Sequence, residues 1–432
     1  MSTPAPPRWQ MIAGAAICNA LEFYDFIVYV YFAPYIAAAF FPGHDSTTKL
    51  LLTFGTFGVS FLARPVGAFI LGHFADAKGR TPAMILAVSL MTLGSAMIAV
   101  MPARASIGLV APFGILAARL IQGFALGGEF GSATALMIEH SKGRESHAAS
   151  WQGTSQNIAG LVGSGFALLL SLALPPSAFH EYGFRLAFGL GVLAGPVAIL
   201  LRRRLQEAPA FLAQKAAGHP PPEATEPTTL PGVAIAAGLV AIGTAQTYLV
   251  IYLPTYASTQ LHMTAGKALG AVVLLYIFTL MMVPLRLAIA RRFDQSASTI
   301  WMIVSCLAMM ATGYPAFIAL TFWPGAVMLF LIPLFFTIIS LPYNSPLTGF
   351  MGMVFPIRHR GIGLSVGYAL GIALFGGFAP YINTWLVART HDPRAPGDYL
   401  ALTSIITIAA IFFARARLPA RVMARGAKAS II

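Results

Sequence analysis

The sequence predicts an all-α membrane protein with twelve transmembrane helices in two six-helix halves. Three observations predict this fold. The chain of 432 residues is 57% hydrophobic and only 9% charged, with a mean hydropathy of +0.76, whereas a soluble domain carries roughly 25% charged residues. Apolar stretches long enough to cross a bilayer, which takes about 20 residues, follow one another along the chain. One long polar connection divides them into two sets of six.

Short turns separate the apolar stretches. Because lipid offers the backbone no hydrogen bonds, we expect each stretch to form a helix. The predicted spans are 11–37, 50–74, 81–101, 107–139, 152–174, 184–201, 232–258, 265–290, 299–320, 323–354, 361–388 and 398–415.

The long connection, residues 205–230, is rich in proline and has the composition of a hydrated linker. It delimits an N-terminal half (1–204) and a C-terminal half (231–432) that ends in a polar tail. Two six-helix halves joined by one polar loop are typical of membrane transporters whose site lies between the halves, near the middle of the bilayer.

The net charge of +13 comes from short basic clusters between the spans. If the N-terminus is cytoplasmic, 18 lysines and arginines fall on the inner side and 6 on the outer side. This bias predicts a multi-pass protein of a bacterial-type inner membrane with both termini and the linker in the cytoplasm. The dispersed clusters argue against nucleic acid as a partner. The two cysteines give no disulfide framework and no metal spacing.

Two short motifs resemble signatures of the major facilitator superfamily. The turn after the second span reads Gly72-His-Phe-Ala-Asp76-Ala-Lys-Gly79-Arg80, and the fourth span contains Arg119-Leu-Ile-Gln122-Gly123. Gly79 would permit a tight turn. Glycines that recur every four residues from Gly123 onward would let another helix approach closely. The resemblance implies a cytoplasmic gate of Asp76, Arg80, Glu139 and Arg144. A solvated loop is the alternative for these charges.

Longer motifs resemble the metabolite:proton symporter family, and within it the citrate/tricarballylate branch. They are Asn19-Ala-Leu-Glu22-Phe-Tyr-Asp25-Phe26, Arg64-Pro65-Val-Gly67 and the end of the sixth span, 201–211. The resemblance implies proton-coupled uptake of a small organic anion, most simply citrate or a related tri- or dicarboxylate, by alternating access. Two departures are Phe23, where that branch often has glutamine, and a decayed second copy of the turn motif around Arg291.

Charged residues inside the predicted spans concentrate in the first half. Glu22 and Asp25 lie three residues apart and share a helical face. Two carboxylates in a low-dielectric site cannot both ionise cheaply, so one of them is a candidate for the coupling proton. The alternative is structural pairing of these acids with Arg64 or Arg119.

Arginine in a span offers a fork of donors suited to a carboxylate. We therefore expect Arg119 and Arg64 to contact an anionic substrate, together with amides and tyrosines that recur on helical faces. For the amides and tyrosines, packing between helices is the alternative. The further candidates are Asn19, Tyr29, Gln122, Gln152, Gln156, Tyr252, Tyr343 and Asn344.

Other functions stay open at this point. The nearest is a proton-coupled carrier of a zwitterion such as proline or betaine, or of shikimate. A drug exporter and a non-transporting sensor are further options, and a membrane enzyme is disfavoured because no nucleophile and base are suitably spaced. We expect no metal and no cofactor, protons as the coupling ion with sodium as the alternative, and a functional monomer in the lipid bilayer.

Overall fold

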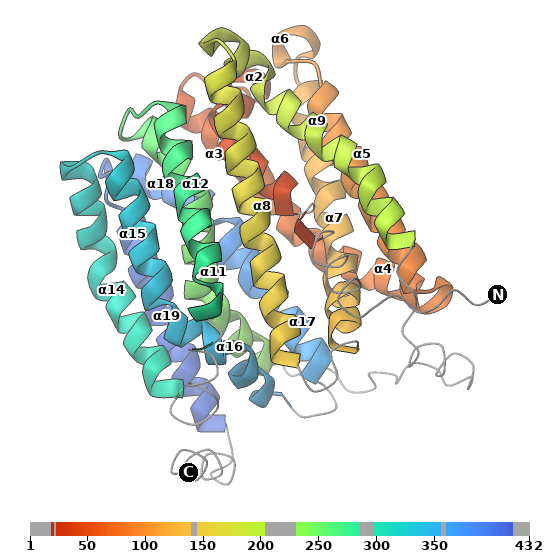
Figure 1. The fold of residues 1–432 in the computed structure, drawn as a ribbon, viewed down its shortest axis with the longest axis vertical. Coiled ribbons are helices and arrows are strands. Elements are labelled where there is room, and N and C mark those ends of the chain that lie inside the picture. Colours follow the sequence, from red (N-terminus) through yellow and green to blue (C-terminus); the bar gives the residue numbers. More distant parts are fainter. Residues whose placement is uncertain are drawn as a thin grey trace. The chain divides into compact units, whose positions relative to one another are not determined.

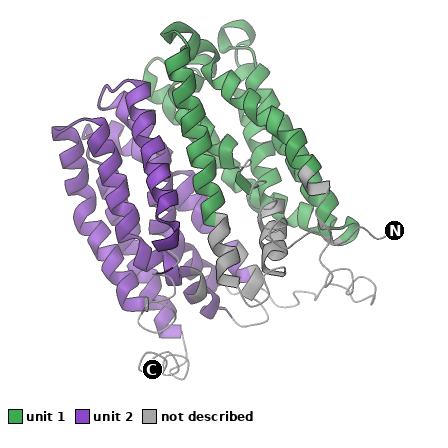
Figure 2. Ribbon diagram, viewed as in Figure 1, with its two compact units in different colours: residues 1–223 green, residues 224–432 purple. Residues whose placement is uncertain are grey.

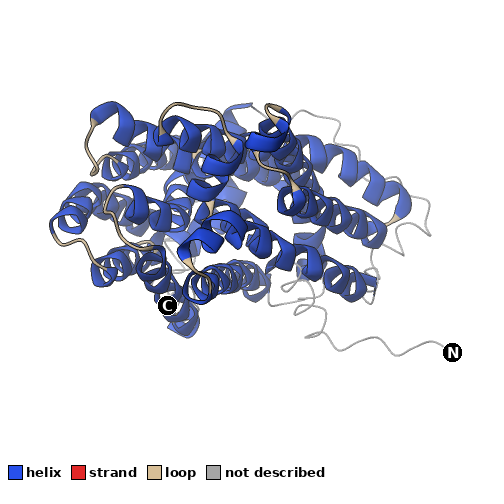
Figure 3. Cartoon of the chain, turned by 90° about the horizontal axis from the view of Figure 1, so that it is seen from above, coloured by secondary structure: helices blue, strands red, loops and turns tan. Residues whose placement is uncertain are grey.

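The computed structural model describes residues 19–20, 23–139, 145–203, 230–285, 288, 298–355 and 360–417. Every regular element in these ranges is helical (Figure 3). The chain forms two compact units, Met1–Glu223 and Ala224–Ile432 (Figure 2). The predicted linker lies outside the described residues apart from Leu230.

The first unit opens with a helix over Phe23–Tyr31. The helices that follow it along the chain (Figure 1) are α2 (Ala33–Phe40), α3 (Ser46–Leu62), α4 (Arg64–Lys78), α5 (Arg80–Val100), α6 (Arg104–Ile107), α7 (Val110–Glu139), α8 (Glu145–Ala173) and α9 (Pro176–Arg203).

The second unit is also built from helices. They are α11 (Leu230–Thr259), α12 (Ala265–Met281), α14 (Ser298–Phe322), α15 (Ala326–Ile339), α16 (Leu341–Met353), α17 (Arg360–Gly371), the π-helical segment η2 (Ile372–Gly377), α18 (Ala379–Thr390) and α19 (Pro396–Arg417).

The described helices account for all of the predicted spans. Nine described helical stretches are each long and apolar enough to cross a membrane; one of them combines α3 with α4, and another combines α17, η2 and α18. Two further helix pairs each make one bent span. The remaining predicted span, 265–290, corresponds to the shorter apolar helix α12. Large apolar side chains also point outward, such as Phe69 (68% exposed) and Leu172 (73%), as lipid rather than water would favour. The predicted fold class is confirmed.

Two spans predicted as continuous helices are in fact bent. The first span turns by 71° at Phe32, and the tenth turns by 47° at Ser340. In each case a proline, Pro34 or Pro342, occupies one of the first two positions of the helix that restarts. Proline lacks an N–H and crowds the preceding turn, so the helix breaks there and then resumes.

The sixth span starts earlier than the sequence predicted. Helix α9 begins at Pro176 instead of at residue 184. Residues 176–183, which include the polar His180 and Glu181, lie outside the predicted span. Proline at the first helical position is, however, a start signal, since its missing N–H would be unpaired there anyway.

Glycines bring the backbones of three helices of the first unit together. A Cβ atom at Gly67 would fall on the carbonyl of Phe124, and one at Gly123 would fall on the carbonyl of Ser60. Helix α7 therefore lies directly against α3 and α4, as predicted for Gly123. The predicted tight turn at Gly79 is also confirmed, because this residue has φ +110° between α4 and α5.

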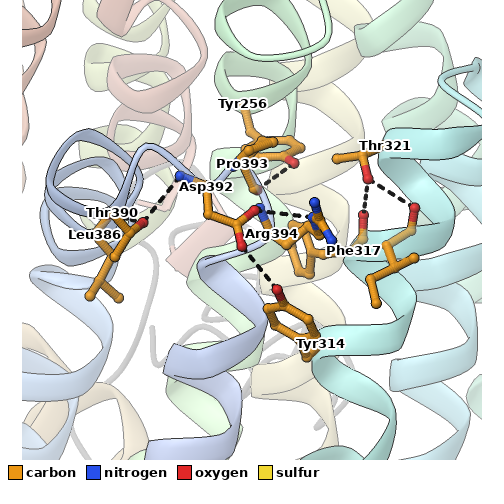
Figure 4. A network of polar contacts seen from close by, with 10 residues as sticks. Tyr256, Tyr314, Phe317, Thr321, Leu386, Thr390, Asp392, Pro393 and Arg394 are labelled. Carbon is orange, nitrogen blue, oxygen red and sulfur yellow. Dashed lines mark hydrogen bonds and ion pairs between the residues drawn. The ribbon is translucent and has the colours of Figure 1, made fainter.

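A polar network in the second unit holds the connection between α18 and α19 (Figure 4). The Tyr314 hydroxyl donates to Asp392 Oδ2 at 2.9 Å, and the Tyr256 hydroxyl donates to the Pro393 carbonyl at 2.7 Å. The Arg394 backbone N–H donates to Asp392 Oδ1 at 2.9 Å. That backbone hydrogen bond, with the Tyr314 hydroxyl and the Arg394 charge, holds the Asp392 pKa below its ordinary value. The connection is thereby tied to α11 and α14.

We expect Gly123→Ala to lower the free energy of unfolding by about 1–3 kcal/mol, because the added methyl group must push α7 away from α3. Thermal unfolding of the detergent-solubilised protein measures this effect. Gly165→Ala on α8 is the matched control, since a Cβ there meets nothing within 4 Å. Equal melting temperatures for the two variants would contradict the close backbone contact.

We expect Asp392→Asn to lower stability at pH 7 by about 1 kcal/mol or less, because the site is partly exposed. A carboxylate with a lowered pKa stabilises the fold above its ordinary pKa of 3.8, and this contribution is lost as the pH falls below that value. The difference between wild type and variant, measured by thermal unfolding, should therefore vanish in acid. A difference that does not shrink as the pH falls below 3.8 would refute this role.

Candidate functional site

A chain of hydrogen bonds joins Asp25 to Arg119 inside the first unit. Arg119 Nη1 donates to Gln122 Oε1 at 2.7 Å, and Gln122 Nε2 donates to Ser95 Oγ at 2.9 Å. The Ser95 hydroxyl then donates to Asp25 Oδ2. All four side chains are buried. An acid on the first span, a hydroxyl on α5 and two groups one turn apart on α7 thus form one connected unit.

Aromatic rings enclose the Arg119 guanidinium. Its Cζ lies 4.2 Å from the ring centroid of Tyr29, 4.6 Å from that of Phe26 and 5.2 Å from that of Phe57. Tyr29 stacks on Phe57, and its hydroxyl lies 2.6 Å from Thr56 Oγ1. A desolvated cation over such rings gains about 2 kcal/mol. The rings thereby stabilise the buried positive charge and hold the guanidinium in place.

A second arginine shares this aromatic cluster. Arg64 Cζ lies 4.3 Å from the Phe61 centroid and 5.4 Å from the Phe26 centroid. Phe26 therefore contacts both guanidiniums, Arg64 from α4 and Arg119 from α7. The structure brings together the two arginines that the sequence predicted as anion-binding residues.

Helix α9 makes room for the acid of the first span. A Cβ atom at Gly191 would fall on Asp25 Oδ1, so only glycine leaves space for this carboxyl group. One turn earlier, the Ala187 carbonyl accepts a hydrogen bond from the Tyr24 hydroxyl at 2.9 Å. Asp25 Oδ1 itself is buried and has no hydrogen-bond partner within the described part of the chain. One carboxyl oxygen is thus bound to Ser95, while the other lies against Gly191 without a hydrogen bond from the described residues.

The remaining candidates of the first half are dispersed. The Asn19 amide donates to Ser155 Oγ at 2.6 Å and so joins the first span to α8. Gln156 is half-buried on α8. Glu22 and Arg144 lie outside the described residues, as do the side chains of Asp76, Arg80, Glu139 and Gln152, so the second candidate acid and the gate stay predictions.

The candidates of the second half differ in their contacts and in their exposure. Thr384 Oγ1 and the Tyr252 hydroxyl lie 3.2 Å apart, and the Tyr343 hydroxyl donates to the Leu239 carbonyl. Asn344 is exposed. These contacts link α11 to α18 and to α16, which fits the packing alternative for Tyr343.

Sequence reasoning missed several residues of this cluster and one buried amide of the second unit. Ser95 gave no signal, because an isolated serine in an apolar span usually bonds to its own helix. Phe57 and Phe61 have helical spacing and resemble ordinary packing residues. Asn383 is an amide within a predicted span, and so it carried the same signal that singled out Gln152 and Gln156.

Comparison with known proteins identifies the family. Residues 15–380 match the sequence profile of the Major Facilitator Superfamily. The chain belongs to this superfamily. A xylose transporter from Escherichia coli, solved in a partially occluded inward-open conformation, has the same fold, with a TM-score of 0.73 at 13% identity over 95% of this chain and 98% of that chain.

Curated relatives extend over nearly the full chain. A citrate-proton symporter from Klebsiella pneumoniae is 34% identical over 418 residues, covering 94% of this chain and 93% of the relative. An alpha-ketoglutarate permease from Escherichia coli (strain K12) is 33% identical over 397 residues, covering 86% and 85%. A proline/betaine transporter from Salmonella typhimurium is 28% identical over 417 residues, covering 91% and 81%.

These findings confirm the resemblance seen in the motifs. The protein is a multi-pass, proton-coupled transporter of a small molecule and not an enzyme. Its bacterial symporter relatives place it in the inner membrane.

We expect Gln122→Leu to lower the free energy of unfolding by about 1.5–3 kcal/mol, because the buried Arg119 Nη1 loses a charge-assisted hydrogen bond. Chemical or thermal unfolding in detergent checks this value. Gln156→Leu makes the same chemical change at a half-buried position on α8 and should have a smaller effect. If both substitutions lowered the free energy of unfolding by the same small amount, the chain of hydrogen bonds would not contribute to stability.

Proposed function

We propose that this transporter takes up a small organic anion together with protons, and that its cargo is citrate or a related tri- or dicarboxylate. The observation that carries the proposal is the buried chain of hydrogen bonds from Asp25 to Arg119. It links a group that can bind a proton to a group that can bind a carboxylate. A symporter needs both groups, and binding at each group must change the affinity of the other for its ligand.

Ser95 supplies the first step of this coupling. An ionised carboxylate only accepts hydrogen bonds, so the Ser95 hydroxyl donates to Asp25. A protonated Asp25 can itself donate, and Ser95 then turns its hydrogen to the Met91 carbonyl, 3.1 Å away. In both states Ser95 still accepts from Gln122. The orientation of one hydroxyl therefore follows the protonation of Asp25, while no hydrogen bond of the chain is lost.

Arg119 receives the effect at the other end. While Asp25 is ionised, its negative charge partly offsets the guanidinium charge. A proton removes that charge, and the field at Arg119 then favours an anion. Coupling between two sites is reciprocal, so the anion in turn favours the proton. Typical coupling free energies of about 1–3 kcal/mol correspond to about 5- to 150-fold in affinity.

The aromatic cluster argues against a betaine-type cargo in this unit. A quaternary ammonium group would need free aromatic faces as a cage. Here the rings of Phe26, Tyr29, Phe57 and Phe61 already face the two guanidiniums. The relatives named for citrate and alpha-ketoglutarate also exceed the proline/betaine transporter in identity. Both lines support an anion over a zwitterion.

The proposal includes the expectations that complete the transport cycle. Transport proceeds by alternating access, and Asp76, Arg80, Glu139 and Arg144 form the cytoplasmic gate. Both termini face the cytoplasm, and the functional unit is a monomer. Protons are the coupling ion, and no cofactor takes part.

We expect Asp25→Asn to abolish accumulation of citrate while exchange of internal for external citrate continues, because the variant can bind the anion but cannot carry the proton. Arg119→Ala should lower both activities by on the order of 100-fold, as about 2.7 kcal/mol of binding free energy would. Radiolabelled citrate uptake and counterflow in proteoliposomes with an inward proton gradient measure these effects.

Two exposed residues provide controls for these substitutions. Asp45→Asn and Arg104→Ala remove the same charges far from the cluster and should leave uptake unchanged. Citrate accumulation by Asp25→Asn would exclude this acid as the proton carrier. If the wild type carried proline or betaine but no carboxylate, the proposed cargo would be wrong.

A further inference from the structure

The second unit contains a buried amide without hydrogen bonds. Asn383 on α18 is fully buried, and neither its Oδ1 nor its Nδ2 has a hydrogen-bond partner within the described residues. Two other buried amides, Asn19 and Gln122, are both hydrogen-bonded. Native structures rarely leave such groups unpaired, because each loses its hydrogen bonds to water without replacement. Asn383 therefore needs a partner that the described residues do not supply.

Further polar groups lie next to Asn383 in sequence. Thr384 Oγ1 lies 2.8 Å from the Pro380 carbonyl and 3.2 Å from the Tyr252 hydroxyl. A threonine hydroxyl has one hydrogen, so when Thr384 donates to Pro380, Tyr252 can donate to Thr384. Asn383 and Thr384 both belong to the buried face of α18. This face therefore offers hydroxyl and amide groups in an otherwise apolar span.

An irregular turn fixes the direction of Asn383. The π-helical segment η2 comes just before α18. A π turn holds more residues than an α turn, so the side chains after it are rotated relative to an unbroken helix. The turn is secured, since the Tyr399 hydroxyl donates to the Phe375 carbonyl at 2.8 Å and Gly376 packs against the ring of Tyr248. Such π turns are frequent at functional sites.

We propose that Asn383, with the adjacent Tyr252–Thr384 hydroxyl pair, forms a subsite in the second unit for the hydroxyl group of a hydroxy-carboxylate cargo. An amide both donates and accepts, and so does an alcohol hydroxyl, whereas a carboxylate only accepts. The two unpaired atoms of Asn383 thus match a hydroxyl better than they match a carboxylate. This subsite rests on the proposed function, and it adds recognition of a hydroxyl group to that function.

Kinetics with two cargos test the subsite. Citrate and tricarballylate differ only in the citrate hydroxyl, so each kcat/KM is measured in proteoliposomes under the same proton gradient. Asn383→Leu removes both hydrogen-bonding atoms at similar size. We expect it to lower kcat/KM for citrate about 10-fold or more and to leave tricarballylate within about 2-fold. Ser404→Ala is the control, since that hydroxyl bonds only to its own helix at Leu400.

A second readout separates binding from structure. A buried amide whose hydrogen-bond partner is the cargo destabilises the cargo-free protein. Asn383→Leu should therefore raise the melting temperature of the cargo-free protein by on the order of 1–2 °C. A lowered melting temperature, or an equal loss of transport for both acids, would show a structural amide only and overturn the proposal. Asn383→Thr, which keeps a donor and an acceptor, should restore part of the preference for citrate.

The carboxylate cargo and the subsite at Asn383 can be tested independently. If the wild type carries neither acid, the carboxylate assignment is wrong, and proline against 4-hydroxyproline replaces the cargo pair in the same assay. The subsite is then supported if Asn383→Leu removes discrimination by the hydroxyl and raises the melting temperature. It is overturned if the variant discriminates as the wild type does.

Discussion

A bilayer offers no hydrogen bonds, and this constraint governs where the polar atoms of the protein can lie. Serine and threonine hydroxyls in the spans mostly turn back to carbonyls of their own helices, as Ser164 does to Gly160. The exceptions join different helices, and the proposed function and the proposed subsite draw on two of them, at Ser95 and at Thr384. The chain from Asp25 to Arg119 crosses three helices, and its arginine is shielded by aromatic rings instead of water.

The two units meet this constraint in different ways. The first unit gathers two arginines around Phe26, and the proposed function assigns charge recognition to them. The described part of the second unit has a hydroxyl- and amide-bearing face at Tyr252, Asn383 and Thr384 instead. Helix breaks before Pro34 and Pro342 give both units a bent span within the same overall plan.

Composition and spacing were enough to predict the helices, their number and the arginines, because hydropathy and charge are properties of single residues. Arg64 and Arg119 stood out for this reason. Contacts between helices could not be predicted in the same way. Ser95 and Gly191 acquire their roles only through Asp25, which lies 70 residues from Ser95 in sequence. The bends at Phe32 and Ser340 had a signal in the following prolines, but hydropathy alone does not register it.

The glycine contacts of the first unit also bear on how affinity can change during transport. Helix α4 carries Arg64 and helix α7 carries Arg119, and the two backbones touch at Gly67 and at Gly127, where a Cβ would fall on the Arg64 carbonyl. With no side chains between them to repack, these helices have little freedom to slide. This contact fixes the distance between the two guanidiniums. In the proposed mechanism, release of the anion therefore comes from altered charge or from solvent entry, rather than from separating the two arginines.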